Sequence, residues 1–436
     1  MLLGFTGVAM LSATAGAILA MTMSSTPLLQ RKLSPAEAAV FSKGELSSVN
    51  SLQLPELTRP VNILVLGAKV LTSDVDDASS QQQLGYHALV NSFDGLTDTM
   101  LLLRFTPATK RVVLLSIPRD TRVEIPGHGV SKINAANSLG GPALSAQSVS
   151  NLLGGVGIDR YVTINVTGVE ALIDALGGVT VDVPKDMKYQ DDSQHLYVNL
   201  KAGRQHLNGN QALQLLRFRN DELGDIGRVQ RQQMVMRALS EQTLNPTILA
   251  RLPKILSVIR SHIDTNLTVE ELFALVAFGT SVNRSNMQML IMPGDYGDIE
   301  TYGTSYWLPN MAQIPNLAAQ FFETGATSGD GLGAANLRVA VQSRTQTVTP
   351  ESIAALLERS GYTNVYPSDA YGEPLKTTRI IAQQGDVKSA EAVRQILGLG
   401  EVLVDGTGDL TSDVTVQVGT DWAQRQSPAQ LPRIKQ

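Results

Sequence analysis

Residues 94–121 read DGLTDTMLLLRFTPATKRVVLLSIPRDT and carry the clearest secondary-structure signal in this chain of 436 residues. They contain two runs of mainly aliphatic residues, 100–105 and 112–117, each with the length of a buried strand. The intervening residues 106–111 include Pro107 and have the length of a hairpin turn. The stretch therefore predicts two neighbouring strands joined by a tight turn.

Further strands and helices extend in both directions from this hairpin. Residues 61–66 form another run of β-branched residues and leucine, and residues 179–183 and 287–292 are similar. Apolar residues recur with helical spacing in 138–153, 167–176, 208–216, 227–244, 247–260 and 268–279. This alternation predicts an α/β fold in which a mixed β-sheet is sandwiched by helices.

Changes in composition divide the chain into segments. The sequence ETGATSGDGLGAA at 323–335 is dense in Gly, Ser and Thr and predicts a linker. Residues 336–420 beyond it predict a small C-terminal α/β domain, followed by a polar tail at 421–436. Residues 24–60 predict a stalk with one short helix, which leaves 61–322 as the main domain.

The start of the chain differs from the rest in charge. Residues 1–30 contain no Asp, Glu, Lys or Arg, and residues 1–23 are mostly apolar. A helix of this length can cross a bilayer, so we expect a single transmembrane anchor at 1–23, with a cleaved signal peptide or a buried core helix as alternatives. The first charges, Arg31 and Lys32, conflict with an exported domain, because basic residues favour the cytoplasmic side.

Composition excludes several classes of function. The chain has no cysteine, which rules out thiol nucleophiles, cysteine-ligated zinc, iron–sulfur clusters and disulfides. Its formal net charge is −5, which argues against nucleic acid as the main partner. The five histidines are scattered without the spacing of metal ligands.

Charged residues are unevenly distributed within the main domain. Residues 69–98 hold five acids and one base, residues 104–132 hold six bases and two acids, and residues 201–237 hold seven bases and three acids. Carboxylates suit a hard cation such as Mg²⁺, and arginines suit phosphate groups. The pattern indicates either a site for a polyphosphate with a metal ion or a solvated surface of salt bridges.

The positions of several charged residues favour a site. Arg119 and Asp120 directly follow the strand 112–117, and Asp98 directly precedes the strand 100–105. Strand ends are where α/β sheets bind ligands. These positions therefore favour a polyphosphate–metal site over a solvated surface of salt bridges.

A second group of candidates lies further along the chain. Arg217 and Arg219 stand two residues apart in LRFRN and would share one face if that segment is extended. Arg228 and Gln232 are four residues apart, on one face of a predicted helix, and Asp225 directly precedes that helix and could cap it. A helix N-terminus nearby would also attract an anion.

With these residues in view, the sequence resembles the LytR–CpsA–Psr family of bacterial cell-envelope proteins. The segments that carry the resemblance appear in family order: VNILVLG (61–67), DGLTDTMLLLRFTP (94–107), LLSIPRDTRVEIPG (114–127), KINAANSLGGP (132–142), LIDALGGVTVDVP (172–184), LNGNQALQLLRFRND (207–221) and DIGRVQRQQ (225–233). Residues 336–420 resemble the small C-terminal domain of many members.

The resemblance implies a cell-wall transferase. Such proteins are held by one N-terminal helix in the cytoplasmic membrane, with the catalytic domain on its outer side. They transfer a glycopolymer from a polyprenyl-pyrophosphate carrier to peptidoglycan, which forms a phosphodiester and leaves polyprenyl phosphate. The lipid tail occupies an apolar pocket within the α/β domain, and Mg²⁺ or Mn²⁺ assists at the pyrophosphate. A pyrophosphatase side activity is compatible with the same site.

The resemblance also suggests roles for individual residues. Asp98 matches the metal-binding acid, and Asp120 and Asp225 match acids that could act as a catalytic base or orient an arginine. Residues matching the pyrophosphate-binding positions are Arg119, which is also a catalytic candidate, Lys132, Arg217, Arg219, Arg228 and Gln232. Many members carry a second metal-binding acid where this chain has Lys69, so either Asp74, Asp76, Asp77 or Asp94 completes the metal shell or the lysine replaces part of its charge.

Two other functions stay open at this point. A non-catalytic polyprenyl-phosphate-binding protein or scaffold would be consistent with Lys69, and a membrane-tethered regulator of transcription would need a cytoplasmic domain. The sequence does not identify the glycopolymer, its acceptor, the role of the C-terminal domain or the oligomeric state. Candidates for the walls of the lipid pocket are Leu101, Leu103, Val162, Leu172, Leu176, Val235 and Leu239, which would also suit an ordinary core.

Overall fold

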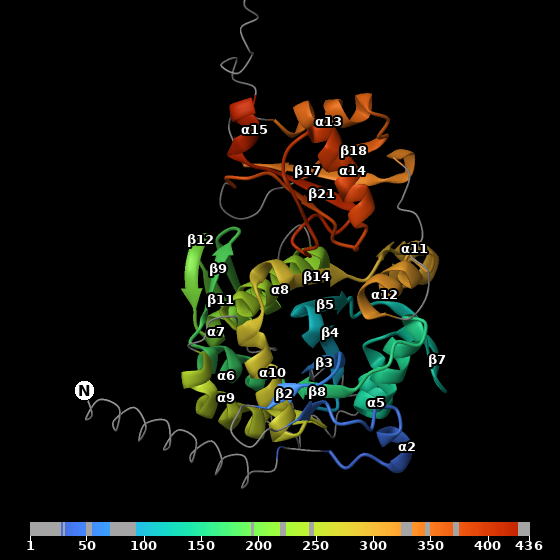
Figure 1. The fold of residues 1–436 in the computed structure, drawn as a ribbon, viewed down its shortest axis with the longest axis vertical. Coiled ribbons are helices and arrows are strands. Elements are labelled where there is room, and N and C mark those ends of the chain that lie inside the picture. Colours follow the sequence, from blue (N-terminus) through green and yellow to red (C-terminus); the bar gives the residue numbers. More distant parts are fainter. Residues whose placement is uncertain are drawn as a thin grey trace, which may run out of the picture.

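The protein folds into two α/β units, each built on its own sheet (Figure 1). The computed structural model describes residues 28, 31–48, 55–69, 93–192, 196–218, 224–243, 248–323, 334–344, 349–368 and 375–425. The predicted anchor at 1–23, Arg219 and most of the predicted linker lie outside these residues. Within the described part of the chain, no helix is both long and apolar enough to span a bilayer.

The first unit has a six-stranded mixed sheet in the order β13-β8-β3-β4-β5-β14. The strands are β3 (Val61–Lys69), β4 (Leu96–Thr106), β5 (Arg111–Ile117), β8 (Arg160–Ile164), β13 (Ile263–Thr265) and β14 (Met287–Ile291). The predicted hairpin is confirmed, because β4 pairs antiparallel with β5 around the turn η2 (Pro107–Thr109). Strand β3 is antiparallel to β4 and parallel to β8, and β14 is parallel to β5, so the sheet is mixed as expected.

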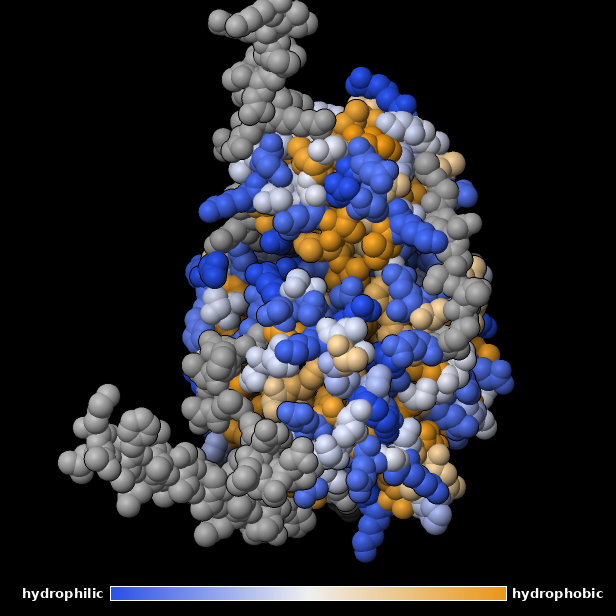
Figure 2. All heavy atoms as spheres, in the orientation of Figure 1, coloured by the Kyte–Doolittle hydropathy of each residue, from blue (hydrophilic) through white to orange (hydrophobic). Residues whose placement is uncertain are grey.

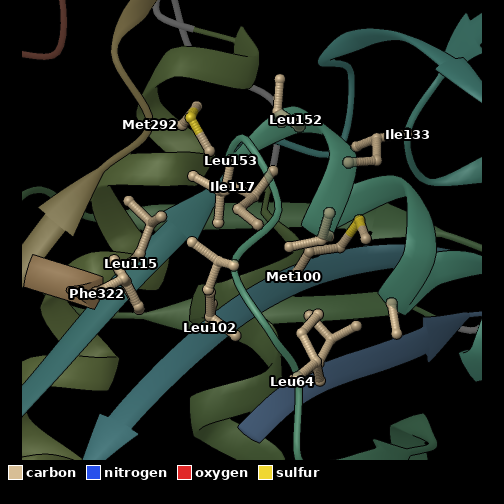
Figure 3. Packing of buried hydrophobic residues seen from close by; sticks show 14 of the residues in the cluster. Leu64, Met100, Leu102, Leu115, Ile117, Ile133, Leu152, Leu153, Met292 and Phe322 are labelled. Carbon is tan, nitrogen blue, oxygen red and sulfur yellow. The ribbon is translucent and has the colours of Figure 1, made fainter. Parts of the chain in front are cut away.

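One face of this sheet packs against α5 (Ala135–Leu152) and α12 (Ile314–Phe322). Figure 3 shows this core, in which Phe322 of α12 lies beside Leu115 of β5, and Leu102 and Leu152 belong to the same apolar cluster. Helix α5 begins three residues earlier than predicted and is kinked at Gly140 and Gly141. Gly141 has a φ of 66°, a left-handed conformation that favours glycine.

The other face is covered by a second layer of helices. These are α6 (Val166–Leu176), α8 (Gly224–Thr243), α9 (Ile248–His262) and α10 (Val269–Ser281). Because side chains alternate along a strand, Leu101 and Leu103 of β4 point to this layer while Leu102 points to α5. The predicted arrangement of a sheet between two helical layers is confirmed.

A subsidiary layer adjoins α6 and was only partly foreseen. Strand β9 (Val179–Val183) matches its prediction, and it pairs with β12 (Gly203–Leu207). The hairpin of β10 (Met187–Asp191) and β11 (Leu196–Leu200) was not predicted. Helix α7 (Gly209–Arg217) packs on these strands and shares their apolar cluster.

Two small antiparallel pairs stand at the end of the sheet where β3 and β5 terminate. Strands β6 (Arg122–Ile125) and β7 (Gly129–Lys132) form the first pair. The second pair is β15 (Gly294–Tyr296) with β16 (Trp307–Pro309), and the short helix α11 (Ile299–Tyr302) lies between them in sequence. The turn η3 (Arg284–Asn286) leads into β14.

The prediction of a stalk at 24–60 is wrong for the residues that the structure describes. Leu28, Phe41, Leu46 and Leu57 are buried against the first unit. This segment contains α2 (Pro35–Ala38), with a capping box at Ser34, and the paired strands β1 (Ser47–Ser48) and β2 (Glu56–Leu57). The apolar residues that looked isolated in sequence therefore complete the core of the domain.

The second unit contains a five-stranded sheet in the order β18-β17-β21-β19-β20. Its elements are η4 (Ala334–Asn336), β17 (Arg338–Ser343), α13 (Pro350–Arg359), β18 (Asn364–Pro367), β19 (Arg379–Ile381), α14 (Val387–Leu397), β20 (Glu401–Leu403), β21 (Val414–Val418) and α15 (Thr420–Arg425). The small C-terminal α/β domain is present as expected. The predicted polar tail is partly wrong, because α15 continues the fold and Trp422 is buried in its core.

The two units are joined by backbone hydrogen bonds. Strand β14 is the last strand of the six-stranded sheet, and its outward N–H groups at Met289 and Ile291 donate to the carbonyls of Val404 and Gln383 at 3.1 and 2.9 Å. The C-terminal unit thus covers one edge of the main sheet. Figure 2 shows apolar surface gathered over this unit and running toward the junction.

Candidate pyrophosphate site

A tight turn places Arg119 and Asp120 at the end of β5. The N–H of Thr121 donates to the carbonyl of Pro118 at 3.0 Å, and the Thr121 hydroxyl donates to the same oxygen at 2.5 Å. Thr121 is fully buried and bridges to Trp307 of β16. Because proline fixes its own φ and threonine closes the turn, the two charged residues between them hold a defined position.

A β-bulge places Asp98 beside this turn. In the pairing of β3 with β4, Gly67 lies opposite Thr99 and Ala68 lies opposite Thr97, so Asp98 is the extra residue. A bulge leaves one residue outside the regular ladder and redirects its side chain. Asp98 stands at the start of β4, which is the same sheet edge as the ends of β3 and β5.

A continuous network of ion pairs joins the candidates at this edge. The Arg119 guanidinium lies 2.5 Å from Asp98 through Nη1 and 3.3 Å from Asp120 through Nε. The Lys132 Nζ lies 2.9 Å from the other oxygen of Asp120. The four side chains are between 17% and 27% exposed, so they are shielded yet open to a ligand. The structure thus brings the candidates Asp98, Arg119, Asp120 and Lys132 together.

The segment before α5 holds this network in place. The N–H groups of Ile133 and Asn134 donate to the carbonyls of Thr121 and Arg119 at 2.8 and 3.2 Å. The buried amide of Asn137 donates to the carbonyls of residues 93 and 95 at 2.9 and 2.7 Å. Sequence reasoning did not single out Asn137, although it lies in the KINAANS segment that carried the resemblance.

Arg217 and Asp225 lie in different backbone contexts from those expected. Arg217 is the last residue of α7, so the prediction of an extended LRFRN segment is wrong at this position. Helix α8 begins at Gly224, so Asp225 lies within its first turn and does not precede it as a cap. The prediction about Arg219 falls outside the described residues.

Arg228 and Gln232 lie on α8 as predicted, with Arg228 buried and Gln232 half-buried. Their neighbour Arg231 is also buried, donates to the Phe218 carbonyl at 2.5 Å and lies 5.3 Å from the centre of that ring. Helix α8 is therefore fixed to the end of α7, which carries Arg217.

The start of α8 approaches the same end of the sheet as the ion-pair network. Val229, next to Arg228, packs against Ile291 and Trp307. The backbone N–H of Trp307 donates to the Asp120 carbonyl at 2.9 Å. Trp307 therefore connects helix α8, which carries Arg228, to the turn that holds Arg119. The sequence did not point to Trp307, because it lies outside the segments that resemble the family.

The carboxylates at this edge suit one hard cation that also binds phosphate oxygens, and they do not suit a metal held by protein ligands alone. Within the described ranges, no group of three or more acids or histidines could hold a metal. Asp98 and Asp120 flank Arg119, and Mg²⁺ commonly uses one or two carboxylates together with phosphate oxygens. Asp94 lies 2.8 Å from Arg31, while Asp74, Asp76 and Asp77 fall outside the described residues.

The predicted pocket residues lie between the sheet and the second layer of helices. Leu101 packs with Leu114 and Met289, and the remaining candidates belong to neighbouring clusters that include α6, α8, α9 and α10. Leu176 and Val235 are buried. Four candidates in this interior layer stay partly exposed: Leu103, Val162, Leu172 and Leu239.

Comparisons with known proteins agree with this fold. The model of the LytR_cpsA_psr family matches residues 30–322, and the model described as LytR cell envelope-related transcriptional attenuator matches residues 336–422. The regulatory protein MsrR of Staphylococcus aureus (strain COL) is 35% identical over 210 residues. That match covers 47% of this chain and 62% of MsrR, which is less than two thirds of that relative.

A second relative has a named activity and a solved structure. The polyisoprenyl-teichoic acid–peptidoglycan teichoic acid transferase TagV of Bacillus subtilis is 30% identical over 281 residues, 63% of this chain and 67% of TagV. Its crystal structure matches with a TM-score of 0.50 and 28% identity over 61% of this chain and 98% of that one. Protein gbs0355 of Streptococcus agalactiae shares the fold, with a TM-score of 0.51, 22% identity and coverage of 62% and 90%. Since the first family model covers well over half of the sequence, the chain belongs to the LytR–CpsA–Psr family.

Proposed function

We propose that this protein is a phosphotransferase that attaches a glycopolymer from a polyprenyl-pyrophosphate carrier to peptidoglycan. The observation that supports this most strongly is the network of Asp98, Arg119, Asp120 and Lys132 at one sheet edge. Arginine presents a planar fork that matches phosphate oxygens, and lysine adds a point charge. The activity named for TagV is consistent with such a site.

The chemistry needs charge stabilisation more than a covalent nucleophile. An acceptor hydroxyl oxygen forms a bond to the phosphorus on the polymer side, and the bond from that phosphorus to the bridging oxygen breaks. The electron pair stays on the bridging oxygen, which leaves as part of polyprenyl phosphate. Arg119 and Lys132 would stabilise the charge on the phosphate oxygens. Asp120, placed between them, would accept the proton of the hydroxyl or orient Arg119.

A divalent ion fits this site as a supplement to the arginine. Asp98 would hold Mg²⁺ or Mn²⁺ together with pyrophosphate oxygens, and the ion would supply further positive charge. When pyrophosphate and metal are bound, the Arg119 guanidinium would turn from Asp98 toward the phosphate. Asp98 would then face the metal cation and Arg119 the phosphate anion, so each charged side chain would keep a partner of opposite charge.

The carrier lipid would extend from the network into the layer between the sheet and α8 to α10. The partly exposed Leu103, Val162 and Leu239 line this layer. We further propose that residues 1–23 form a membrane anchor and that both folded units lie outside the cytoplasmic membrane. That placement brings the site to the compartment where lipid-linked polymers meet peptidoglycan.

The test uses the purified full-length protein with a polyprenyl-pyrophosphate-linked saccharide and a peptidoglycan acceptor. Transfer is expected for the wild type and lost for Arg119→Ala. Arg111→Ala is the matched control, because Arg111 is exposed at the opposite end of the same strand. Wild-type turnover by Arg119→Ala would reject this site. Binding of the lipid without transfer, with either Mg²⁺ or Mn²⁺ present, would favour a non-catalytic scaffold instead.

A further inference from the structure

A cluster of aromatic rings lies next to the ion-pair network, on residues 294–309. Tyr302 and Tyr306 meet edge to face with their ring centres 6.0 Å apart, and Tyr296 meets Trp307 in the same way at 5.0 Å. The N–H of residue 297 donates to the Tyr306 carbonyl at 2.8 Å, which closes the segment on itself. The rings therefore have a fixed arrangement before any ligand arrives.

This aromatic cluster is continuous with the network. The Lys132 Nζ lies 5.8 Å from the centre of the Tyr306 ring and 2.9 Å from Asp120. The neighbouring Trp307 donates its backbone N–H to the Asp120 carbonyl. A polymer with one of its hydroxyl groups at Asp120 would therefore place its neighbouring sugar unit near the tyrosine rings.

The cluster presents both apolar and charged surface to solvent. Tyr296 and Tyr302 are each 39% exposed and Ile299 is 60% exposed, while Trp307 beneath them is 2% exposed. The Arg122 guanidinium lies 5.6 Å from the centre of the Tyr302 ring. Tyrosine offers wide, stiff contact area with a polar tip, and the electron-rich ring face attracts polarised C–H groups. Sugar rings present such C–H groups on their faces and hydroxyl groups at their edges.

We propose that Tyr296, Tyr302 and Tyr306, with Arg122, form the subsite that binds the acceptor glycan strand of peptidoglycan. This inference rests on the proposed transferase function and identifies where the second substrate lies. The open, exposed shape of the cluster suits a long polymer that enters and leaves sideways. Arg122 adds a cation that complements the carboxylates of an acidic glycan strand.

The two sides of the sheet favour the acceptor over the carrier lipid of the donor for this subsite. In a phosphoryl transfer the attacking and leaving oxygens lie roughly in line, on opposite sides of the phosphorus. The proposed lipid layer is on the side of α8 to α10, whereas Tyr302 and Tyr306 lie over Arg122 and Lys132 of the β6–β7 pair, which packs with α5. Trp307 lies between the two sides, since it also packs with Val229 of α8. The leaving lipid phosphate and the Tyr302–Tyr306 end of the aromatic cluster would thus approach the network from different sides.

The binding test uses full-length protein in detergent micelles and isothermal titration calorimetry. The probes are a peptidoglycan tetrasaccharide without stem peptides and, separately, a sugar-free polyprenyl pyrophosphate. The double variant Tyr302→Ala with Tyr306→Ala is expected to bind the tetrasaccharide about tenfold more weakly. Tyr197→Ala is the matched control, because Tyr197 is also exposed but stands on the remote β10–β11 hairpin.

The kinetic test separates this inference from the proposed function. The double variant is expected to raise the KM for the acceptor about tenfold more than the KM for the donor. An equal effect on both substrates, or a tetrasaccharide affinity matching that of Tyr197→Ala, would overturn the acceptor subsite. If Arg119→Ala keeps wild-type transfer while the tyrosine variant loses glycan binding, the pyrophosphate site fails and the glycan subsite stands.

Discussion

The Arg119 guanidinium and the Asp98 carboxylate lie 2.5 Å apart, although 21 positions of sequence separate them. One residue comes from a turn after β5 and the other from a bulge at the start of β4. Each neutralises the other in the ligand-free protein. A pyrophosphate that arrives with a divalent ion can replace both halves of this pair at once, with the anion at the arginine and the cation at the carboxylate.

Arg119→Lys tests whether the fork of the guanidinium matters beyond its charge. Lysine keeps the positive charge but cannot contact Asp98 and Asp120 in two directions. We expect kcat/KM for transfer to fall by about 10²–10³-fold, the effect of losing one well-placed donor to a developing oxyanion. Steady-state kinetics at saturating metal would measure this. A loss under threefold would show that charge alone suffices.

Asp98→Asn tests the coupling between metal and pyrophosphate. Without the carboxylate, Arg119 loses a competing partner, so inorganic pyrophosphate should bind more tightly in the presence of EDTA than it does to the wild type. The same variant should lose the gain in pyrophosphate affinity that Mg²⁺ gives to the wild type. Calorimetric titration measures both effects. Asp186→Asn is the control, since Asp186 is an exposed carboxylate that pairs with Lys201 and the N–H of Ala202, away from the site.

A buried ion pair stabilises the fold away from the site. Arg160 of β8 donates to both oxygens of Glu271 on α10, at 3.0 and 2.6 Å, and also to the carbonyls of Ser42 and Gly44. Arg160→Met leaves the Glu271 carboxylate buried without its cation, so the free energy of unfolding should fall by about 3–5 kcal/mol. Denaturant unfolding measures this, and the added change Glu271→Leu should restore part of the loss. No loss in the single variant would contradict the role of this pair.

Asp264 predicts a pH dependence of stability. Its carboxylate is buried, accepts from the N–H of Arg31 and from the Tyr161 hydroxyl, and burial raises its pKa. Because the folded protein holds this proton more tightly than the unfolded chain, the contribution is favourable at low pH and is lost as pH rises through the raised pKa. The wild type should therefore lose free energy of unfolding, relative to Asp264→Asn, as the pH rises above about 4, the ordinary pKa of an aspartate. A difference that stays constant above that pH would contradict this assignment.

Removal of residues 336–436 should expose the edge of β14. Met289 and Ile291 would lose their carbonyl partners from Val404 and Gln383, and an open strand edge promotes association between chains. We expect concentration-dependent oligomers in sedimentation experiments and a lower midpoint of thermal unfolding. A truncated protein that stays monomeric with an unchanged midpoint would show that the C-terminal unit only rests on the sheet.

The sequence predicts the central hairpin well because each strand contains four consecutive apolar residues, Met100–Leu103 and Val112–Leu115. It misses β8, because Arg160 breaks the apolar run and its partner Glu271 lies on a distant helix. It also misses β10, whose sequence MKYQD is mostly polar, and the three-residue β13. Strands stabilised by partners far along the chain leave little local signal.

The same limit applies to the site. Their positions at strand ends favoured Asp98 and Arg119 as site residues, but the bulge that places Asp98 beside Arg119 depends on the register of β3 with β4. The aromatic cluster was missed, because Tyr302 and Tyr306 lie in a segment with no regular spacing. Arg31 and Lys32 were expected to favour the cytoplasmic side of the membrane, in conflict with an exported domain. In the structure, Arg31 lies 2.8 Å from Asp94 and so forms part of the folded domain.

The burial of Leu28 has a consequence for how the proposed transferase would meet its lipid carrier. Leu28 is 7% exposed and packs in the cluster of Leu176 and Ile255, in the helical layer proposed for the lipid. Only residues 24–27 separate it from the apolar run at 1–23, a span of at most about 18 Å when fully extended. With that run in the membrane, the folded domain would stay close to the membrane surface. The domain would then meet lipid-linked substrate by two-dimensional diffusion in the membrane plane. Only peptidoglycan strands close to the membrane surface would reach its site.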